Sequence, residues 1–296
     1  MRGAFAAETM TVPLPRSLKC ASFNLLHGGF SSGLTGSARD LTPRLAMAAV
    51  ELRKMNVDVI GLQEASTSPA QGNVGVRLAA QLGYHAVYAP ASCRLFPCER
   101  LNSLVARAFR FTEGPAIVSR FPIQEWRVQL LPRCSRLTEP RVLLSAILQT
   151  PWGLLPVAST HTSGKVQQHK TLAESLHHRR RALPTLLMGD FNAPEDSHAM
   201  ATLTSKAGFV DAFRDVHPTA AGFTCDQALY TPTPTVSERI DYILVLPGTA
   251  ATSRIRSSCT CLNAPQRLPD GRILWPSDHY GVLTEIELFP LSGEIR

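Results

Sequence analysis

The stretch VDVIGLQE, from Val57 to Glu64, is a nearly continuous apolar run that ends in two polar side chains. Such a run is typical of a β-strand that is buried on both faces. A carboxylate at the end of a buried strand requires a partner, because an unpaired buried charge is costly. Glu64 is therefore a candidate functional residue, and a salt bridge or a helix N-cap would explain it equally well.

Strands and helices alternate on both sides of this stretch, which predicts an α/β fold. Further strands are expected at residues 18–25, 114–121, 141–149, 154–159, 184–188, 239–246 and 280–288. Helices are expected from Thr42-Pro43 onward, with Thr42 as N-cap, and at residues 76–82, 167–180 and 197–207. Gly83 and Gly208 should end two of them, and Asp196 or Ser197 should cap the last. Residues 84–112 and 218–237 show no regular pattern and are interpreted as loops.

The chain has 296 residues, of which 44% are hydrophobic, so a large core can be buried. We expect one domain at residues 18–290, preceded by an N-terminal extension (1–17) and followed by a short tail (291–296). A single domain is favoured because the polar motifs described below would be separated by a boundary anywhere between them. No apolar run is long enough to cross a bilayer and no signal peptide is evident, which predicts a cytoplasmic protein.

The formal net charge of +7 favours a polyanionic partner: nucleic acid, an acidic membrane surface or a phosphorylated small molecule. An ordinary basic surface would also account for this charge. Many arginines lie between residues 94 and 141, and another group forms the run HHRRR at residues 177–181. The seven cysteines form no regular framework and are interpreted as free thiols. No partner protein is evident.

Polar side chains recur at the ends of the predicted strands. Six motifs carry them in one order: Ser22-Phe23-Asn24, Leu62-Gln63-Glu64, Ser159-Thr160-His161, Gly189-Asp190-Phe191-Asn192, Arg239-Ile240-Asp241-Tyr242 and Ser277-Asp278-His279. Carboxylates and amides suit a hard cation such as Mg²⁺, and a His beside an Asp suits proton abstraction from water. Taken singly, Asn24 and the Asp190–Asn192 pair are also explained by turns, and His161 by an ordinary polar contact. Their joint occurrence predicts one hydrolytic centre.

Two of these motifs allow more specific expectations. Asp241 lies inside the apolar run RIDYILVL, so it should have a buried partner, for which His279 is the candidate. Asp190 and Asn192 are two residues apart, which would place both side chains on the same side of an extended backbone.

The segments NLLHG, DVIGLQE, GPAIVSRFPI, STHT, LLMGDFNAPEDS, RIDYILV and LWPSDHYGV together resemble the endonuclease/exonuclease/phosphatase (DNase I-like) superfamily, in particular its uncharacterised bacterial members. The resemblance covers nearly the whole chain. It implies a four-layer α/β sandwich in which two face-packed mixed β-sheets are flanked by helices. The activity it implies is metal-dependent hydrolysis of phosphoester bonds, with Mg²⁺, or alternatively Mn²⁺, as the cofactor and an anionic phosphoester as the substrate.

The resemblance also implies a role for each motif. Glu64 would be the main metal ligand, with Asn24 and Asp278 close to the cation directly or through water. His279 would be the general base, oriented by Asp241. Three further residues would act on the phosphate and the attacking water: His161 as a hydrogen-bond donor, and Asp190 with Asn192 as orienting groups.

Three functions stay open on the sequence alone. A nucleic-acid phosphodiesterase is slightly favoured by the basic charge and by the arginines at positions 94, 100, 107 and 110. A sphingomyelinase-like or inositol-phosphate hydrolase is the alternative, with Leu95-Phe96 as the candidate apolar contact to a membrane. An inactive binding protein is least favoured, because Glu64 and His279 are both present. AP endonucleases are disfavoured by His161 and by the lack of Lys after Ala65.

Overall fold

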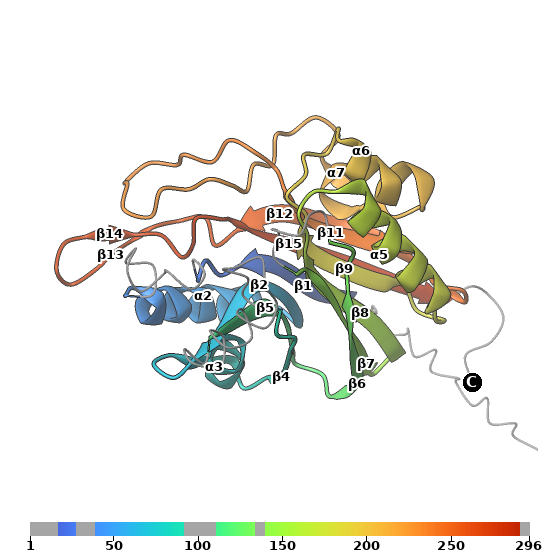
Figure 1. Cartoon of the computed structure of the whole chain (residues 1–296), viewed down its shortest axis with the longest axis horizontal. Coiled ribbons are helices and arrows are strands. Elements are labelled where there is room, and N and C mark those ends of the chain that lie inside the picture. The colour runs from blue at the N-terminus through green and yellow to red at the C-terminus, as the bar shows by residue number, and fades with distance from the viewer. Residues whose placement is uncertain (1–16, 28–38, 92–110, 134–139, 291–296) are drawn as a thin grey trace, which may run out of the picture.

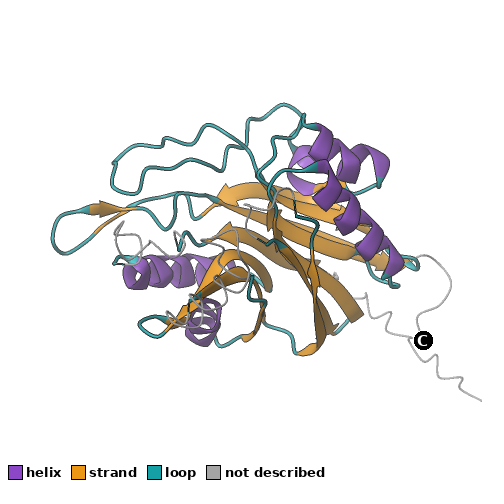
Figure 2. Ribbon diagram, in the orientation of Figure 1, coloured by secondary structure: helices purple, strands orange, loops and turns teal. Residues whose placement is uncertain are grey.

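Two β-sheets pack face to face in the computed structural model of the chain, which describes residues 17–27, 39–91, 111–133 and 140–290 (Figures 1 and 2). The first sheet has the strand order β12 (Ala251–Cys261), β15 (Gly281–Pro290), β1 (Ser17–Asn24), β2 (Val59–Ser68), β5 (Thr112–Ser119) and β4 (His85–Tyr88). The short strand β3 (Gly72–Asn73) pairs with β2. The second sheet has the order β10 (Val210–Asp211), β11 (Asp241–Leu246), β9 (Thr185–Asp190), β8 (Gly153–His161), β7 (Val142–Thr150) and β6 (Ile123–Leu130). Strands β13 (Gln266–Arg267) and β14 (Ile273–Leu274) form a separate pair.

Both large sheets are mixed. The pairs β1–β2 and β8–β9 are parallel, and their neighbours in each sheet run antiparallel to them. Helices α2 (Leu41–Met55) and α3 (Val74–Leu82) pack on the outer face of the first sheet. Helices α5 (Val166–His178) and α6 (His198–Ala201), with the π-helical turn η1 (Thr202–Lys206), pack on the outer face of the second. Helix α7 (Ala212–Val216) lies beside β11 and β12. The predicted four-layer α/β sandwich is confirmed.

The largest apolar cluster lies between the two sheets, and one residue that packs against it must be small. Gly61 of β2 approaches β9 so closely that an added Cβ would lie 2.5 Å from Cβ of Met188. Nearby, Ser159 Oγ of the second sheet donates to the carbonyl oxygen of Leu62 at 3.0 Å, and Gln63 Nε2 donates to the same hydroxyl at 3.3 Å. The two sheets therefore lie in close contact just below the strand ends that carry the polar motifs.

Replacing Gly61 with Ala should destabilise the fold, because the new methyl group overlaps Met188 and two packed sheets must move apart. Overpacking of this kind costs about 1–3 kcal/mol. We expect a lower urea midpoint with an unchanged slope, measured by equilibrium unfolding. An unchanged midpoint would show that the sheets accommodate the methyl group without cost.

Most of the predicted elements are present. Gly83 ends α3 in a left-handed conformation (φ 74°), and Gly208 follows η1 with φ 71°. Ser197 caps α6 by accepting from the backbone N–H of Met200. The strands expected at residues 141–149 and 154–159 are β7 and β8, which pair as a hairpin. The four cysteines of the described segments, Cys20, Cys225, Cys259 and Cys261, are free thiols, as expected.

Three local predictions are wrong. Helix α2 begins at Leu41, with Asp40 rather than Thr42 as N-cap, and the Asp40 carboxylate makes no cap bond because it pairs with Tyr230 and Arg272. The interpreted loop at 84–112 contains strand β4, which pairs with β5. Asn192 is not extended but left-handed, with φ 46°.

Two long strands, and the two-residue strands β3, β10, β13 and β14, were not anticipated. Strand β6 is an exposed edge strand, so its residues show little apolar periodicity, and β12 is polar on much of its length. The expected N-terminal extension, the tail, and the arginines and Leu95-Phe96 of residues 92–110 lie outside the described segments. None of the helices in the described part of the chain has both the length and the apolar character needed to span a membrane.

Candidate active site

The topology brings the polar strand ends to one edge of the sandwich. Parallel strands present their carboxyl ends at the same edge, so Asn24 of β1 lies beside the end of the apolar part of β2, and His161 of β8 lies beside Asp190 of β9. Antiparallel neighbours bring their first residues to that edge. Asp241 therefore pairs directly with Asp190 in register, and Asp278 and His279 arrive just before β15.

Glu64 owes its orientation to an irregularity in β2. The pairing of β2 with β5 shifts register between Leu62 and Ala65, and Glu64 adopts a left-handed conformation with φ 53°. A bulge of this kind re-aims a side chain that regular alternation would place elsewhere. Asn24 Nδ2 donates to Glu64 Oε1 at 3.2 Å and to Asp190 Oδ2 at 3.1 Å, so one amide holds carboxylates from both sheets.

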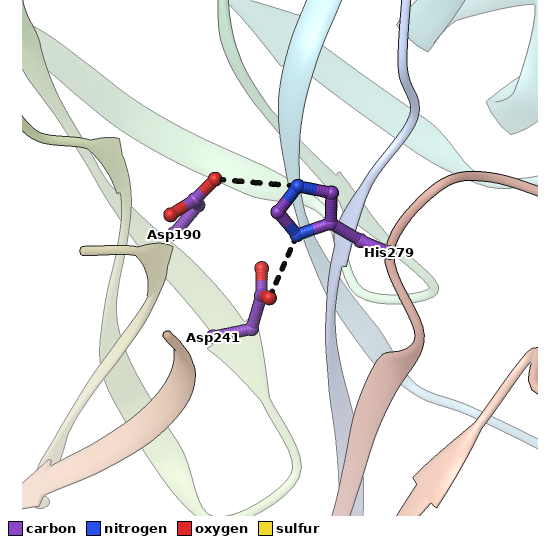
Figure 3. Close-up of side chains that lie close together, drawn as sticks. All are labelled: Asp190, Asp241 and His279. Atoms are coloured by element: carbon purple, nitrogen blue, oxygen red, sulfur yellow. Dashed lines mark hydrogen bonds and ion pairs between the residues drawn. The ribbon is translucent and has the colours of Figure 1, made fainter. Parts of the chain in front are cut away.

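His279 lies between two buried carboxylates, as Figure 3 shows. Its Nδ1 is 2.8 Å from Asp241 Oδ2, which is the buried pairing expected for Asp241, and its Nε2 is 3.9 Å from Asp190 Oδ2. Burial alone would lower the pKa of His279, but the charges of Asp241 and Asp190 raise it well above its usual range. Burial and the nearby Asp241 charge raise the pKa of Asp190 to about 7. The two groups thus form a buried acid–base pair.

Asp278 lies at the more accessible side of the centre. Its Oδ1 is 4.0 Å from His279 Nε2 and accepts from the hydroxyl of Ser277 at 3.2 Å. Burial raises the pKa of Asp278; the charge of His279 opposes this and the charge of Glu64 adds to it. The side chain is still 30% exposed, compared with 2% for Asp190, so Asp278 can reach a solvated ligand.

His161 and Asn192 complete the set. His161 Nε2 lies 3.4 Å from Asp190 Oδ2 and 2.9 Å from Asn192 Nδ2. The left-handed turn at Asn192 lets its backbone N–H donate to Asp190 Oδ1 at 2.9 Å, so Asp190 is held from both of its oxygens. Burial, with the charges of Arg141 and His279, lowers the pKa of His161 well below its usual range, which favours the neutral ring. All eight candidate residues are therefore joined by contacts at one sheet edge.

The sequence matches the model of the Endonuclease/Exonuclease/phosphatase family over residues 21–279, which include every one of these side chains. The chain belongs to this family. Its members are hydrolases that act on phosphoesters and generally depend on divalent metal ions. A search of curated protein sequences finds no significant match.

Solved structures of the family share the fold. A family protein from Bacteroides thetaiotaomicron aligns with 96% of this chain and 99% of its own, at 18% identity and a TM-score of 0.69. A mannosyl-6-phosphatase of the same organism covers 92% of this chain and 99% of its own, at 19% identity and a TM-score of 0.67. TDP2 of D. rerio, complexed with a single-strand DNA product, covers 91% of this chain and 98% of its own, at 18% identity and a TM-score of 0.64.

The structure adds a residue that the motifs of the family resemblance do not include. Arg44 of α2 is 1% exposed, and its guanidinium donates to the carbonyl oxygens of Leu25 at 2.6 Å, Leu26 at 2.7 Å and Pro276 at 3.2 Å. These carbonyls lie next to Asn24 and Asp278. Burial lowers the pKa of Arg44 to about 10, which keeps it charged at neutral pH. One signal was available in the sequence: Arg44 falls on the apolar face of its helix, three residues after Leu41 and four before Ala48.

Replacing Arg44 with Met should lower turnover at saturating metal and lower the thermal midpoint, because three buried carbonyls beside the site lose their donor. Arg44→Lys keeps the charge but lacks the planar fork that can reach several acceptors. If the fork positions the site, the Lys variant should recover the midpoint more than the turnover. Equal recovery of the thermal midpoint and the turnover, in melting and steady-state assays, would show that Arg44 acts through its charge alone.

A second residue that the sequence analysis did not assign is Cys225. The segment around it forms isolated bridges with both Glu238 and His279, and Cys225 Sγ lies 3.6 Å from His279 Nε2. Thr224 beside it is fully buried, and its hydroxyl accepts from the backbone N–H groups of Ile240 and Asp241. Part of the irregular segment 218–237 therefore forms a wall of the centre.

Proposed function

We propose that the chain is a metal-dependent phosphodiesterase in which a water molecule attacks phosphorus in line with the leaving group. In its neutral form, His279 accepts the proton of that water at Nε2, while Nδ1–H donates to Asp241, which fixes the tautomer and stabilises the imidazolium that forms. The buried 2.8 Å contact between His279 and Asp241 is the observation that carries this assignment. Asp190, 3.9 Å from the same Nε2, would orient the water.

The donor set fits a hard cation. The carboxylates of Glu64 and Asp278 offer oxygen ligands at the accessible side of the centre, and Mg²⁺ prefers oxygen ligands together with several waters. Such a cation, when bound, neutralises the phosphate and stabilises the leaving oxygen. Asn24 supports this site by holding Glu64 through its amide nitrogen, while its Oδ1 accepts from Leu26 N–H at 3.0 Å.

Asp190, Asp241 and His279 form a second group compact enough to hold a metal ion. We assign this group to proton transfer instead, because Asp241 Oδ2 already bonds His279 Nδ1 and because imidazole is a poor ligand for Mg²⁺. His161 and Asn192 would contact the phosphate. For His161 to donate from Nε2, the amide nitrogen of Asn192 must turn away, since that nitrogen also donates toward Nε2.

Nucleic acid is the favoured substrate. The net charge of +7 suits a polyanion, and the related TDP2 structure contains a single-strand DNA product. A phosphorylated small molecule or a phospholipid headgroup is the second candidate, and the similarity to a mannosyl-6-phosphatase favours it. An inactive binding protein is the least favoured function, because the sequence retains both Glu64 and His279.

Parallel assays with Mg²⁺ or Mn²⁺ on single-stranded DNA, plasmid DNA, RNA, sphingomyelin, inositol phosphates and mannose 6-phosphate test the proposal. We expect cleavage of a nucleic acid that is lost in excess EDTA and in the His279→Ala variant. Turnover confined to a phosphomonoester or to sphingomyelin would favour the second candidate. Equal inactivity of wild type and variant on every substrate would contradict the hydrolase assignment.

A further inference from the structure

A basic groove lies on the outer face of the second sheet, beside the end of α5. It encloses about 490 Å³, and its floor is formed by β7 and β8 around Ile147 and Pro156. Four arginines line it, Arg127, Arg179, Arg180 and Arg181, and Glu125 is the single acidic residue among the lining side chains. The last four residues of the run HHRRR, His178 to Arg181, thus lie at a hollow surface together with an arginine from the edge strand β6.

Contacts hold these arginines in defined positions. Arg180 donates to the carbonyl oxygens of Pro247 and Gly248, and Arg179 Nη1 lies 3.4 Å from Ser145 Oγ. Arg181 pairs with the carboxylate of Glu125 at 2.8 Å. Arg127 lies 4.0 Å from the other oxygen of the same carboxylate, and its side chain is largely exposed. Four guanidinium groups against one carboxylate give the groove a net charge of +3, as counted from its lining residues.

The chemistry of the groove favours phosphate. Arginine binds phosphate in a bidentate way, and a fixed guanidinium loses less entropy on binding than a free one. A flat acidic bilayer fits less well. Of the exposed apolar side chains of β6, Val128 and Leu130 do not line the groove. Trp126 is among its lining residues, although it shares register with Ala146 of the apolar cluster between the sheets. The groove therefore offers clustered cations in a hollow, with Trp126 as the one exposed large apolar side chain among its lining residues rather than an extended apolar surface.

We propose that this groove binds the phosphate backbone of a nucleic-acid strand outside the hydrolytic centre. Strand β8 connects the two sites, with Pro156 at the groove and His161 at the centre. Five residues of strand span roughly 16 Å, and phosphates recur about every 3.4 Å along one strand of a duplex. A strand several nucleotides long could thus reach both. This inference rests on the nucleic-acid form of the proposed function.

The test is equilibrium binding of a fluorescent single-stranded 30-mer oligonucleotide to the full chain in EDTA, over a series of NaCl concentrations. The variant Arg127→Gln/Arg179→Gln removes two cations of the groove, and Arg254→Gln/Arg256→Gln on β12 removes two exposed cations elsewhere as a matched control. Turnover of bis(4-nitrophenyl) phosphate with Mg²⁺ is measured in parallel, because this small phosphodiester cannot span to the groove.

The groove variant should bind the oligonucleotide about tenfold more weakly at low salt, with a salt slope smaller by roughly 1.4, which corresponds to two phosphate contacts on a single strand. The control should bind like wild type, and all three proteins should turn over the small substrate equally. The same three proteins are also titrated with phosphatidylserine vesicles. Three results would overturn the proposal: no oligonucleotide binding by wild type, an equal loss of oligonucleotide affinity in the groove variant and the control, or a groove variant that loses affinity only for the vesicles. Groove-dependent binding without any turnover would instead count against the proposed hydrolase alone.

Discussion

Glu64→Gln is expected to remove nearly all metal-dependent turnover while leaving the fold intact. Glu64 lies in a bulge at the end of β2 and is part of the accessible oxygen-donor set, so its charge contributes directly to binding a cation. A metal ion stabilises the charge of the transition state by several kcal/mol. At 1.36 kcal/mol per factor of ten, this loss corresponds to a fall of about 10²–10³-fold in turnover.

Isothermal titration with Mn²⁺ separates the two candidate metal groups. Glu64→Gln should weaken metal binding, whereas Asp241→Asn should leave it nearly unchanged, since Asp241 is assigned to His279. Glu174→Gln, on the exposed face of α5, serves as the charge-matched control. Loss of metal binding in Asp241→Asn with full binding in Glu64→Gln would place the ion at the buried group instead.

His279→Ala is expected to lower turnover by about 10²–10⁴-fold, the range typical of a lost general base. Metal binding should persist, because the imidazole is not among the proposed ligands. Asp241→Asn should cause a comparable fall, since the His279 tautomer is no longer fixed. Single-turnover rates of the two single variants and of the double variant measure these losses of turnover.

The double variant is the sharper measurement. Residues that act as a unit give non-additive losses, so His279→Ala/Asp241→Asn should be hardly slower than the worse single variant. His85→Ala, at an exposed position in β4, controls for the loss of an imidazole as such. Fully multiplicative losses would show that Asp241 acts independently of His279.

Much of this centre could be predicted because its residues lie at strand ends, and strands with an apolar run are recognisable. Val57–Leu62 and the run RIDYILVL predicted where polar side chains leave the core, and the buried charge of Asp241 predicted its partner. The edge strand β6 could not be found in this way. Most of its residues are exposed, so hydrophobic burial leaves little trace in its sequence.

Other features depended on distant parts of the chain. Asn192 is left-handed, so the alternation of an extended strand does not apply to it. This turn allows its hydrogen bonds to Asp190 and His161. Asp40 caps no N–H because its carboxylate is engaged by Tyr230, 190 residues away. Cys225 also depends on a distant part of the chain, because it contacts His279 only where an irregular segment folds back over the centre.

The stretch VDVIGLQE and its counterparts thus determined, by themselves, which chemical groups the chain carries and the family to which it belongs. Local apolar patterns and motif order suffice for that, because they reflect burial of each strand. Tertiary structure alone decided how Glu64 is aimed and that Arg44 fastens two loops of the site. It also decided that the consecutive basic residues from His178 to Arg181 meet Arg127 of β6 in a groove. These arrangements require segments far apart in the chain to pack together, and no local pattern encodes that contact.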